Sequence, residues 1–310
     1  MNHQITIREA ITDTDVNTFW KELRIYQTRD IFPDPEDEER EYFLRDDKYR
    51  AHIQALHDRP RDKIHYLFFC RSGQDIGFAL PVIYETEDGK CFILEFCVYP
   101  EFRGNGTGRQ CARALLDWAK ANGASYAELN HGGNTQRYRF WGSVGFVPNG
   151  VDEWGIPLML LPPEENLPFA VEPLTDGTDW QLLHLLNSFL VEIGEGTLND
   201  AQKERLACAV RGKQIRFFQA RRGPRTVGIC SVSTCFSTFD CQTIGSFDDF
   251  YIEPAFRRQG IARQLVAAAL DWCRENGVAS LTVGCADCDV AMYRALGFDL
   301  KLGTLLAAAV

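Results

Sequence analysis

The sequence predicts an α/β protein that carries one domain twice in tandem. A stretch of 30 residues, EFCVYPEFRGNGTGRQCARALLDWAKANGA from Glu95, returns without a gap as DFYIEPAFRRQGIARQLVAAALDWCRENGV from Asp249, 154 positions later. In each copy an apolar strand leads through a turn with proline into an amphipathic helix, and 310 residues are enough for two domains. The residues that the copies share in register include Phe96/Phe250, Pro100/Pro254, Phe102/Phe256, Arg103/Arg257, Gly106/Gly260, Arg109/Arg263, Gln110/Gln264, Leu116/Leu270, Asp117/Asp271, Trp118/Trp272, Asn122/Asn276 and Gly123/Gly277.

The repeat continues upstream of this stretch. Residues 65–84 and 216–235 each predict two apolar strands that are joined by a polar turn with glycine. Further upstream, residues 5–23 and 169–186 each predict a strand followed by a helix. The whole α/β unit is therefore duplicated, at a period far above that of solenoid repeats.

Downstream, the motifs FWGSVGF and MYRALGF each end a helix in Gly-Phe. Between the copies, LLPPEENLPF contains three prolines and predicts a stiff linker. We therefore expect the domains at residues 1–163 and 168–310. The first copy also has a heavily charged helical segment between residues 31 and 62, for which we favour a solvated helix face over a surface that recruits substrate.

Composition narrows the classes of function. The net charge of −10 disfavours binding to nucleic acid or to anionic membranes and would attract cationic small molecules, although for the surface as a whole we favour the simpler interpretation that the acidity keeps the protein soluble. There is no apolar run of the roughly 18 residues that a membrane span needs, and the N-terminus lacks the apolar core of a signal peptide, so we expect a cytoplasmic protein. Of the eleven cysteines, only Cys285 and Cys288 have redox or metal spacing, and no second pair accompanies them. We expect buried or pocket-lining thiols and no metal.

The turn before each amphipathic helix has the composition of a phosphate-binding loop. It reads RGNGTG from Arg103 and RRQGIA from Arg257. Small residues let a ligand approach the backbone, and the N–H groups and dipole of the helix that follows favour a phosphate. The glycine spacing is neither that of a dinucleotide-binding fingerprint nor that of a P-loop.

With its strand, loop and helix written twice, the chain resembles the GNAT superfamily of acetyl-CoA-dependent N-acetyltransferases over nearly its whole length. Arg103, Gly106 and Gly108, and again Arg257, Gly260 and Ala262, match the pyrophosphate signature Q/R-x-x-G-x-G/A. The resemblance implies a mixed sheet flanked by helices, in which the strand before the loop splays from its neighbour and binds pantetheine through its backbone. The cofactor-binding residues that it implies are Phe96, Cys97, Val98, Arg103, Gly104, Asn105, Gly106, Thr107, Gly108 and Asn134 in the first copy, and Phe250, Tyr251, Ile252, Arg257, Arg258, Gln259, Gly260, Ile261 and Ala262 in the second.

The resemblance also implies a tyrosine, four residues before the last glycine, that protonates the departing CoA thiolate. That residue is Tyr293 in the second copy and Trp141 in the first. Because an indole N–H cannot act as an acid and a phenol can, we expect Tyr293 to be catalytic. Tyr138 lies nearly one helical turn before Trp141 and is the substitute to consider.

A carboxylate is expected as the base, since an amine with a pKa near 10 must lose a proton before it attacks the thioester. The second copy offers Asp248 and Asp249, which face opposite sides of their strand, and the first copy offers Glu95. Similarity to polyamine acetyltransferases favours Asp248, whereas similarity to aminoglycoside 3-N-acetyltransferases favours Asp249. A backbone N–H near Tyr251 is the expected oxyanion donor.

We therefore expect an N-acetyltransferase, of the acyltransferase class, that transfers acetyl directly to a primary amine of a small cationic molecule. The second copy would carry the catalysis, and the first would bind CoA without turnover, as in the tandem mycothiol synthases that the layout resembles. Two alternatives stay open. One is a non-catalytic acyl-CoA-binding or regulatory protein, and the other is an acetyltransferase that acts on protein lysines or N-termini. The sequence does not indicate the oligomeric state.

Overall fold

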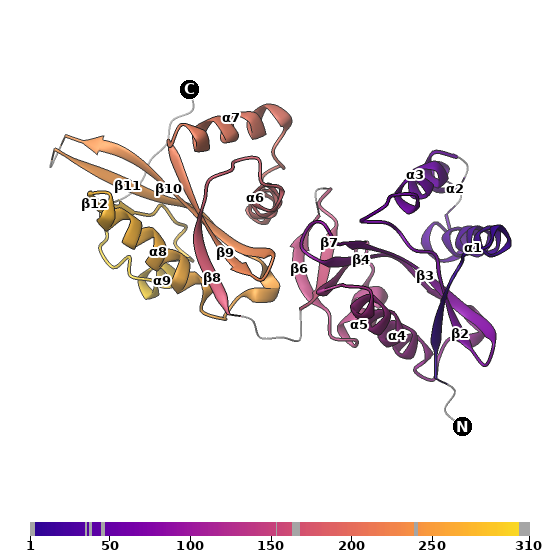
Figure 1. The fold of residues 1–310 in the computed structure, drawn as a ribbon. Coiled ribbons are helices and arrows are strands. Elements are labelled where there is room, and N and C mark those ends of the chain that lie inside the picture. Colours follow the sequence, from indigo (N-terminus) through magenta and orange to yellow (C-terminus); the bar gives the residue numbers. More distant parts are fainter. Residues whose placement is uncertain are drawn as a thin grey trace. The chain divides into compact units, whose positions relative to one another are not determined.

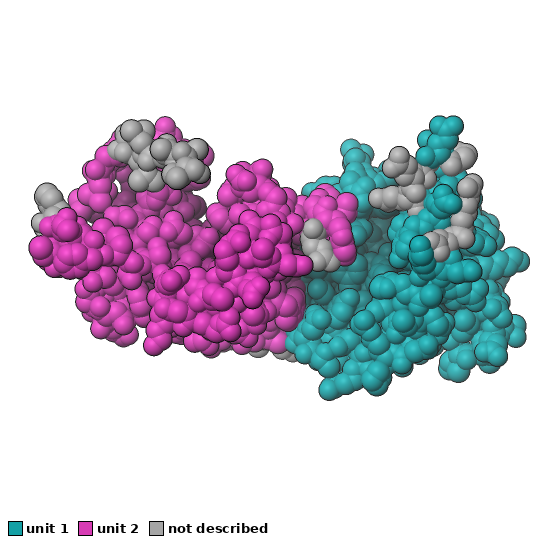
Figure 2. All heavy atoms as spheres, turned by 90° about the horizontal axis from the view of Figure 1, so that it is seen from above, with its two compact units in different colours: residues 1–147, 158–164 teal, residues 148–157, 165–310 magenta. Residues whose placement is uncertain are grey.

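A computed structural model describes residues 4–34, 36, 39–44, 47–152, 154–162, 168–238 and 241–303. The chain divides into two compact units, residues 1–147 with 158–164 and residues 148–157 with 165–310 (Figure 2). Each sheet combines antiparallel strand pairs with a parallel pair, β4 with β5 in the first and β11 with β12 in the second. The expected duplicated α/β architecture is confirmed (Figure 1).

The first sheet has the strand order β1-β2-β3-β4-β5-β7-β6. Its strands are β1 (Thr6–Glu9), β2 (Leu67–Arg71), β3 (Gln74–Tyr84), β4 (Lys90–Val98), β5 (Tyr126–Asn130), β6 (Val147–Val151) and β7 (Pro157–Leu161). The helices that accompany it are α1 (Asp13–Tyr26), the π-helical turn Gln27–Ile31, α2 (Glu39–Leu44), α3 (Asp47–His57), the 3₁₀ turn Pro100–Phe102, α4 (Thr107–Ala121) and α5 (Thr135–Gly142).

Alternating side chains of this sheet fill two separate cores, as period-2 burial requires. On one face, Phe19 and Leu23 of α1 and Ile53 of α3 pack against the sheet. On the other face, helices α4 and α5 cover the sheet with apolar side chains that include Leu115 and Trp141. The strand β4 contributes to both cores, so its two faces look toward different sets of helices.

The second sheet has the order β12-β11-β10-β9-β8. Counted from β8, this order is the same as that of the first five strands of the first sheet, β1 to β5. Its strands are β8 (Phe169–Leu174), β9 (Ile215–Arg222), β10 (Arg225–Ser237), β11 (Gln242–Ile252) and β12 (Val278–Thr282). Its helices are α6 (Trp180–Glu192), α7 (Asp200–Arg211), the 3₁₀ turn Pro254–Phe256, α8 (Ile261–Glu275) and α9 (Val290–Ala295). Leu182 of α6 and Val210 of α7 share a core with Ile229 and Tyr251 of the sheet.

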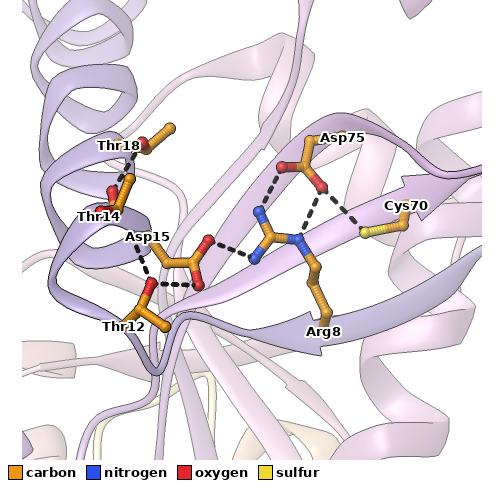
Figure 3. A network of polar contacts seen from close by, with 7 residues as sticks. All are labelled: Arg8, Thr12, Thr14, Asp15, Thr18, Cys70 and Asp75. Carbon is orange, nitrogen blue, oxygen red and sulfur yellow. Dashed lines mark hydrogen bonds and ion pairs between the residues drawn. The ribbon is translucent and has the colours of Figure 1, made fainter.

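A polar network ties the beginning of the first sheet to α1 (Figure 3). The guanidinium of Arg8 donates through Nε to Oδ1 of Asp75 at 3.0 Å and through Nη1 to Oδ1 of Asp15 at 2.9 Å. The thiol of Cys70 donates to the same Oδ1 of Asp75 at 3.0 Å. One arginine thus joins β1 to the start of β3 and to the first turn of α1, and it also stacks 4.3 Å above the ring of Phe68.

Glycine in β3 is required by close backbone approach. A Cβ atom placed on Gly77 would lie 2.2 Å from the carbonyl oxygen of Cys97 on the paired strand β4. At the equivalent place, a Cβ on Gly228 would lie 3.2 Å from the carbonyl oxygen of Tyr251. Both sheets therefore bring β3 or β10 unusually close to the end of the strand that precedes the candidate phosphate loop.

Candidate active sites

The strand before each candidate phosphate loop parts from its parallel neighbour. Strand β4 pairs with β5 only from Lys90 to Phe92, although β5 continues to Asn130. Strand β11 pairs with β12 only from Thr243 to Ser246. Among the described residues, the segments 96–98 and 250–252 thus have no ladder partner on that side, which leaves backbone groups there without a strand to pair with. The splay implied by the resemblance is present in both units.

The loops that follow end in glycines with left-handed backbone. Gly106 has φ 76° and Gly260 has φ 86°, and each is the N-cap of a long helix, α4 or α8. Neither helix start has a side-chain cap among the described residues, whereas Thr12, Asn134, Asp179 and Asn199 cap other helices. No atom lies within 4 Å of a Cβ built on either glycine. Open space in front of uncapped N–H groups suits an anion such as a pyrophosphate.

The remaining loop positions differ between the units. Arg258 has φ 63°, the left-handed conformation that its counterpart Gly104 adopts at φ 89° without strain. The hydroxyl of Thr107 accepts a hydrogen bond from Arg71 at 3.3 Å, and its counterpart Ile261 is buried and apolar. Gly108, where a Cβ would meet the ring of Phe140 at 3.0 Å, keeps α4 close to α5. Of the other predicted loop residues, Asn105 and Gln259 lie in the same turns, and Ala262 lies in the first turn of α8.

The first arginine of each loop makes the same two contacts. Arg103 Nε donates to the carbonyl oxygen of Val98 at 2.7 Å, and its Nη2 pairs with Asp30. Arg257 Nε donates to the carbonyl oxygen of Ile252 at 2.8 Å, and its Nη2 pairs with Glu192 at 2.6 Å. Arg103 therefore links the end of β4 to the π-helical turn after α1, and Arg257 links the end of β11 to the last residue of α6.

The tyrosine and tryptophan before the last Gly-Phe occupy equivalent places with different surroundings. The ring centroid of Tyr293 lies 6.1 Å from that of Phe250, and burial, followed by the charges of Asp289, Cys285 and Asp248, raises the pKa of Tyr293 to about 12. Trp141 is only 6% exposed, and its ring lies 5.0 Å from Phe96.

The substitute considered for Trp141 is far more open. Tyr138 is 41% exposed, and its ring contacts His131 at 5.5 Å. Asn134, the other predicted residue of this region, accepts the backbone N–H groups of Gln136 and Arg137 at 2.9 and 3.0 Å and thereby caps α5.

The two aspartates of β11 have contrasting surroundings. Asp249 is partly buried at a bulge with φ 50°, and its Oδ2 accepts a hydrogen bond from Ser231 at 2.6 Å. Burial raises the pKa of Asp249, the hydrogen bond from Ser231 lowers it in part, and the charge of Asp248 raises it further. Asp248 is exposed and accepts from Ser246 at 2.7 Å. A raised pKa of the kind that Asp249 has is common among catalytic carboxylates.

Glu95 carried little weight in the sequence analysis, although its pKa is clearly raised. Burial raises the pKa of Glu95 from 4.5 to about 7, against a hydrogen bond that Gln27 donates to its Oε1 at 3.2 Å. Gln27 itself is 2% exposed. The sequence identified Glu95 through its alignment with Asp249, but it could not indicate the partner Gln27, which lies 68 residues away.

The described residues contain no group of three or more side chains that could hold a metal ion. Six cysteines are buried, and Cys285 and Cys288 are exposed. None of the described helices is both long enough and apolar enough to cross a bilayer.

A sequence model of the Acetyltransferase (GNAT) family matches residues 22–146 and 180–298. No curated protein matched the sequence. Among solved structures, an aminoglycoside acetyltransferase from an uncultured soil metagenomic sample, in complex with sisomicin, is 17% identical with a TM-score of 0.41, over 46% of this chain and 95% of that one. Glucosamine-6-phosphate N-acetyltransferase from Arabidopsis thaliana is 15% identical with a TM-score of 0.39, over 46% and 98%. A predicted acetyltransferase from Clostridium acetobutylicum, solved with acetyl-CoA, is 15% identical with a TM-score of 0.39, over 46% and 96%.

Proposed function

The chain belongs to the GNAT acetyltransferase family and is an N-acetyltransferase, and we propose that its second unit transfers acetyl from acetyl-CoA directly to a primary amine of a small cationic molecule. One observation carries the assignment to the second unit. In this unit the segment Phe250–Ile252 of β11 has no partner on the β12 side. The same unit supplies a phenol, Tyr293, and a partly buried carboxylate, Asp249, whose pKa is raised. In this proposal residues 168–310 are the catalytic domain, and residues 1–163 bind CoA without turnover.

Acetyl-CoA supplies the acetyl group as a thioester. The backbone of Phe250–Ile252, open on the β12 side, would hold the pantetheine arm, and the uncapped start of α8 at Gly260 would hold the pyrophosphate. Arg257 would stabilise this arrangement, because it donates to the carbonyl oxygen of Ile252 and pairs with Glu192. Positioning of this kind lowers the entropic part of the barrier to transfer.

Asp249 is the proposed base in preference to Asp248. A carboxyl group with a raised pKa is a better proton acceptor than an exposed one, and the hydrogen bond from Ser231 orients its Oδ2. The side chains of Asp249 and Ser231 interact near Ile229 and Tyr251, whose side chains pack in the α6/α7 core. An amine bound on that side would lose its proton to Asp249 directly or through one water.

Tyr293 would act on the leaving group. Its raised pKa keeps the phenol protonated at neutral pH, so it can donate a hydrogen bond and then a proton as negative charge develops on sulfur. The backbone N–H at Tyr251 is the proposed donor to the negative oxygen that develops on the thioester carbonyl. General acid catalysis of this type contributes about 10²- to 10⁴-fold to a rate.

The first unit retains the means to bind CoA but places Trp141 where the acid would stand. Its strand β4 splays from β5 and its loop carries Gly106 before an uncapped helix, as in the second unit. A binding role without turnover fits this combination, and it is the alternative function that we keep for this unit alone.

The test is thiol release from acetyl-CoA across polyamines, aminoglycosides and amino acids. We expect Tyr293→Phe to lower kcat about 100-fold or more. Arg257→Glu should also abolish turnover, because it repels Glu192 and frees the strand carbonyl, whereas the matched Arg103→Glu should spare turnover. The assignment is reversed if Arg103→Glu abolishes turnover and both changes in the second unit are silent. A full panel without thiol release would favour the protein-acetylating or non-catalytic alternative.

A further inference from the structure

A cavity of the first unit lies between α1 and the α2–α3 pair. Its volume is about 340 Å³, within the range of small-molecule sites. It is lined from α1 by Trp20, Lys21 and Arg24 and from α3 by Tyr49 and Arg50. Tyr49 and Arg50 belong to the charged segment between residues 31 and 62, for which the sequence favoured a solvated face. Lys21, Arg24 and Arg50 are exposed, so the cavity opens to solvent on its cationic side, whereas Tyr49 is buried.

The charge of this cavity is opposite to that of the protein. Three cationic side chains, Lys21, Arg24 and Arg50, line it with one acidic residue, Asp47, in a chain of net charge −10. Among the described residues no carboxylate forms an ion pair with any of the three cations. Arg24 donates to the carbonyl oxygen of Leu44, which leaves its charge unneutralised. The cavity therefore favours an anion.

The walls between the cations are aromatic. The guanidinium of Arg50 lies 5.1 Å from the ring centroid of Trp20, and Trp20 meets Tyr49 edge to face with centroids 6.4 Å apart. Phe43 of α2 also lines the cavity. Flat apolar surfaces beside cationic groups suit a ring that carries a carboxylate or phosphate.

The inner end of the cavity reaches the buried polar residues beneath it. Gln27 lines the cavity and donates to Glu95 on β4, so an occupant would lie one side chain away from the cofactor strand. The helix of the second unit that corresponds to α1 is α6 (WQLLHLLNSFLVE), and it contains no lysine or arginine. The two cations that α1 contributes, Lys21 and Arg24, are therefore not part of the repeated pattern.

We propose that this cavity is a binding site for a small molecule that joins an aromatic ring to an anionic group, either a carboxylate or a phosphate. The inference does not depend on which unit transfers acetyl. It gives the first unit a ligand of its own, opposite in charge to the cationic acceptor proposed for the second.

The test uses phenyl phosphate and phenylacetate as probes, titrated calorimetrically into the full chain saturated with CoA. Saturation removes binding at the loops of Gly106 and Gly260 from the measurement. We expect 1:1 binding of both probes and much weaker binding of phenol and of inorganic phosphate, each of which lacks one of the two features.

Charge reversal locates the site. The double variant Lys21→Glu/Arg50→Glu should weaken binding at least about tenfold, since each cation contributes a charge-assisted contact. The matched control Lys203→Glu/Arg274→Glu changes the net charge equally through exposed residues of the second unit and should leave binding unchanged. The proposal is overturned if neither probe binds at millimolar concentration, if both double variants weaken binding equally, or if phenol binds as tightly as phenyl phosphate.

Discussion

Trp141 and Tyr293 occupy the same position in the two repeated units, yet they differ in side-chain chemistry and in their surroundings. Both follow a splayed strand and a glycine-capped helix, and both contact the phenylalanine that begins the open segment, Phe96 or Phe250. Trp141 is buried in an aromatic cluster, whereas Tyr293 keeps a protonated hydroxyl beside the strand. The comparison teaches that a duplicated scaffold can keep its strand and loop geometry while one side chain changes from a phenol to a buried indole.

The carboxylates show the converse pattern. Glu95 and Asp249 are aligned, and burial raises the pKa of both. The first unit therefore retains a group suited to accept a proton even though it lacks the phenol. The units thus differ in the phenol and agree in the carboxylate, so substitutions at one residue at a time can separate them experimentally.

The largest expected effect tests the packing role of Trp141. Trp141→Ala should lower the free energy of unfolding of the first unit by about 4 kcal/mol, because it empties a site in contact with Phe96, Phe140 and Phe146. Tyr293→Phe, the matched change in the second unit, removes only a hydroxyl and should alter stability by less than about 1 kcal/mol. Urea unfolding of the two variants makes the comparison. Equal losses would mean that the two positions are structural in the same way.

The duplicated motif made the architecture predictable, because strand, loop and helix are local patterns with their own spacing. The contacts that decide function are not local. Arg103 meets Asp30, and Arg257 meets Glu192, across 73 and 65 residues, and nothing in either motif indicates these partners. The bulge that turns Asp249 toward Ser231 depends on strand register, which alternation alone cannot give.

The cavity beside Trp20 could not be predicted from the sequence, because it also depends on contacts between separate segments of the chain. A run of charges predicts solvation when it is read along one helix. Lys21 and Arg50 come from different helices, and only packing of α1 against α3 brings their charges around one space.

A second difference between the units lies at the end of the cofactor strand. In the second unit, buried Glu253 pairs with buried Arg225 and accepts from Asn149 at 3.2 Å. In the first unit, Tyr99 and Gln74 occupy the positions of Glu253 and Arg225. The backbone N–H of Tyr99 donates to the carbonyl oxygen of Ile76, just as that of Glu253 donates to Val227, both at 2.9 Å.

Glu253→Ala should therefore lower the free energy of unfolding of the second unit by about 3 kcal/mol, because buried Arg225 loses the carboxylate of Glu253. The exposed pair of Asp271 with Arg274 gives the control, since Asp271→Ala should cost less than about 0.5 kcal/mol. Chemical denaturation measures both. A loss below 1 kcal/mol for Glu253→Ala would show that water compensates Arg225.

Glu95 predicts a pH dependence of stability for the first unit. Its pKa rises from 4.5 to about 7 on folding, so its stabilising contribution is complete below pH 4.5 and is lost as the pH rises to 7. Relative to Glu95→Gln, the wild type should lose roughly 3 kcal/mol over this interval and nothing further above it. Urea midpoints measured for both proteins from pH 4.5 to 8 supply the test. Parallel curves would contradict the buried state of Glu95.

The smallest effect decides between the two aspartates of the second unit. Ser231 donates to Asp249, and this hydrogen bond favours the charged carboxylate. Ser231→Ala should therefore raise the pKa of Asp249 further and move the acidic limb of the pH–rate profile of kcat/KM to higher pH, by up to roughly one unit. Ser246→Ala removes the corresponding donor to exposed Asp248 and should leave the profile in place. A shift with Ser246→Ala alone would make Asp248 the base, and the amine would then approach the strand from the side of Tyr293.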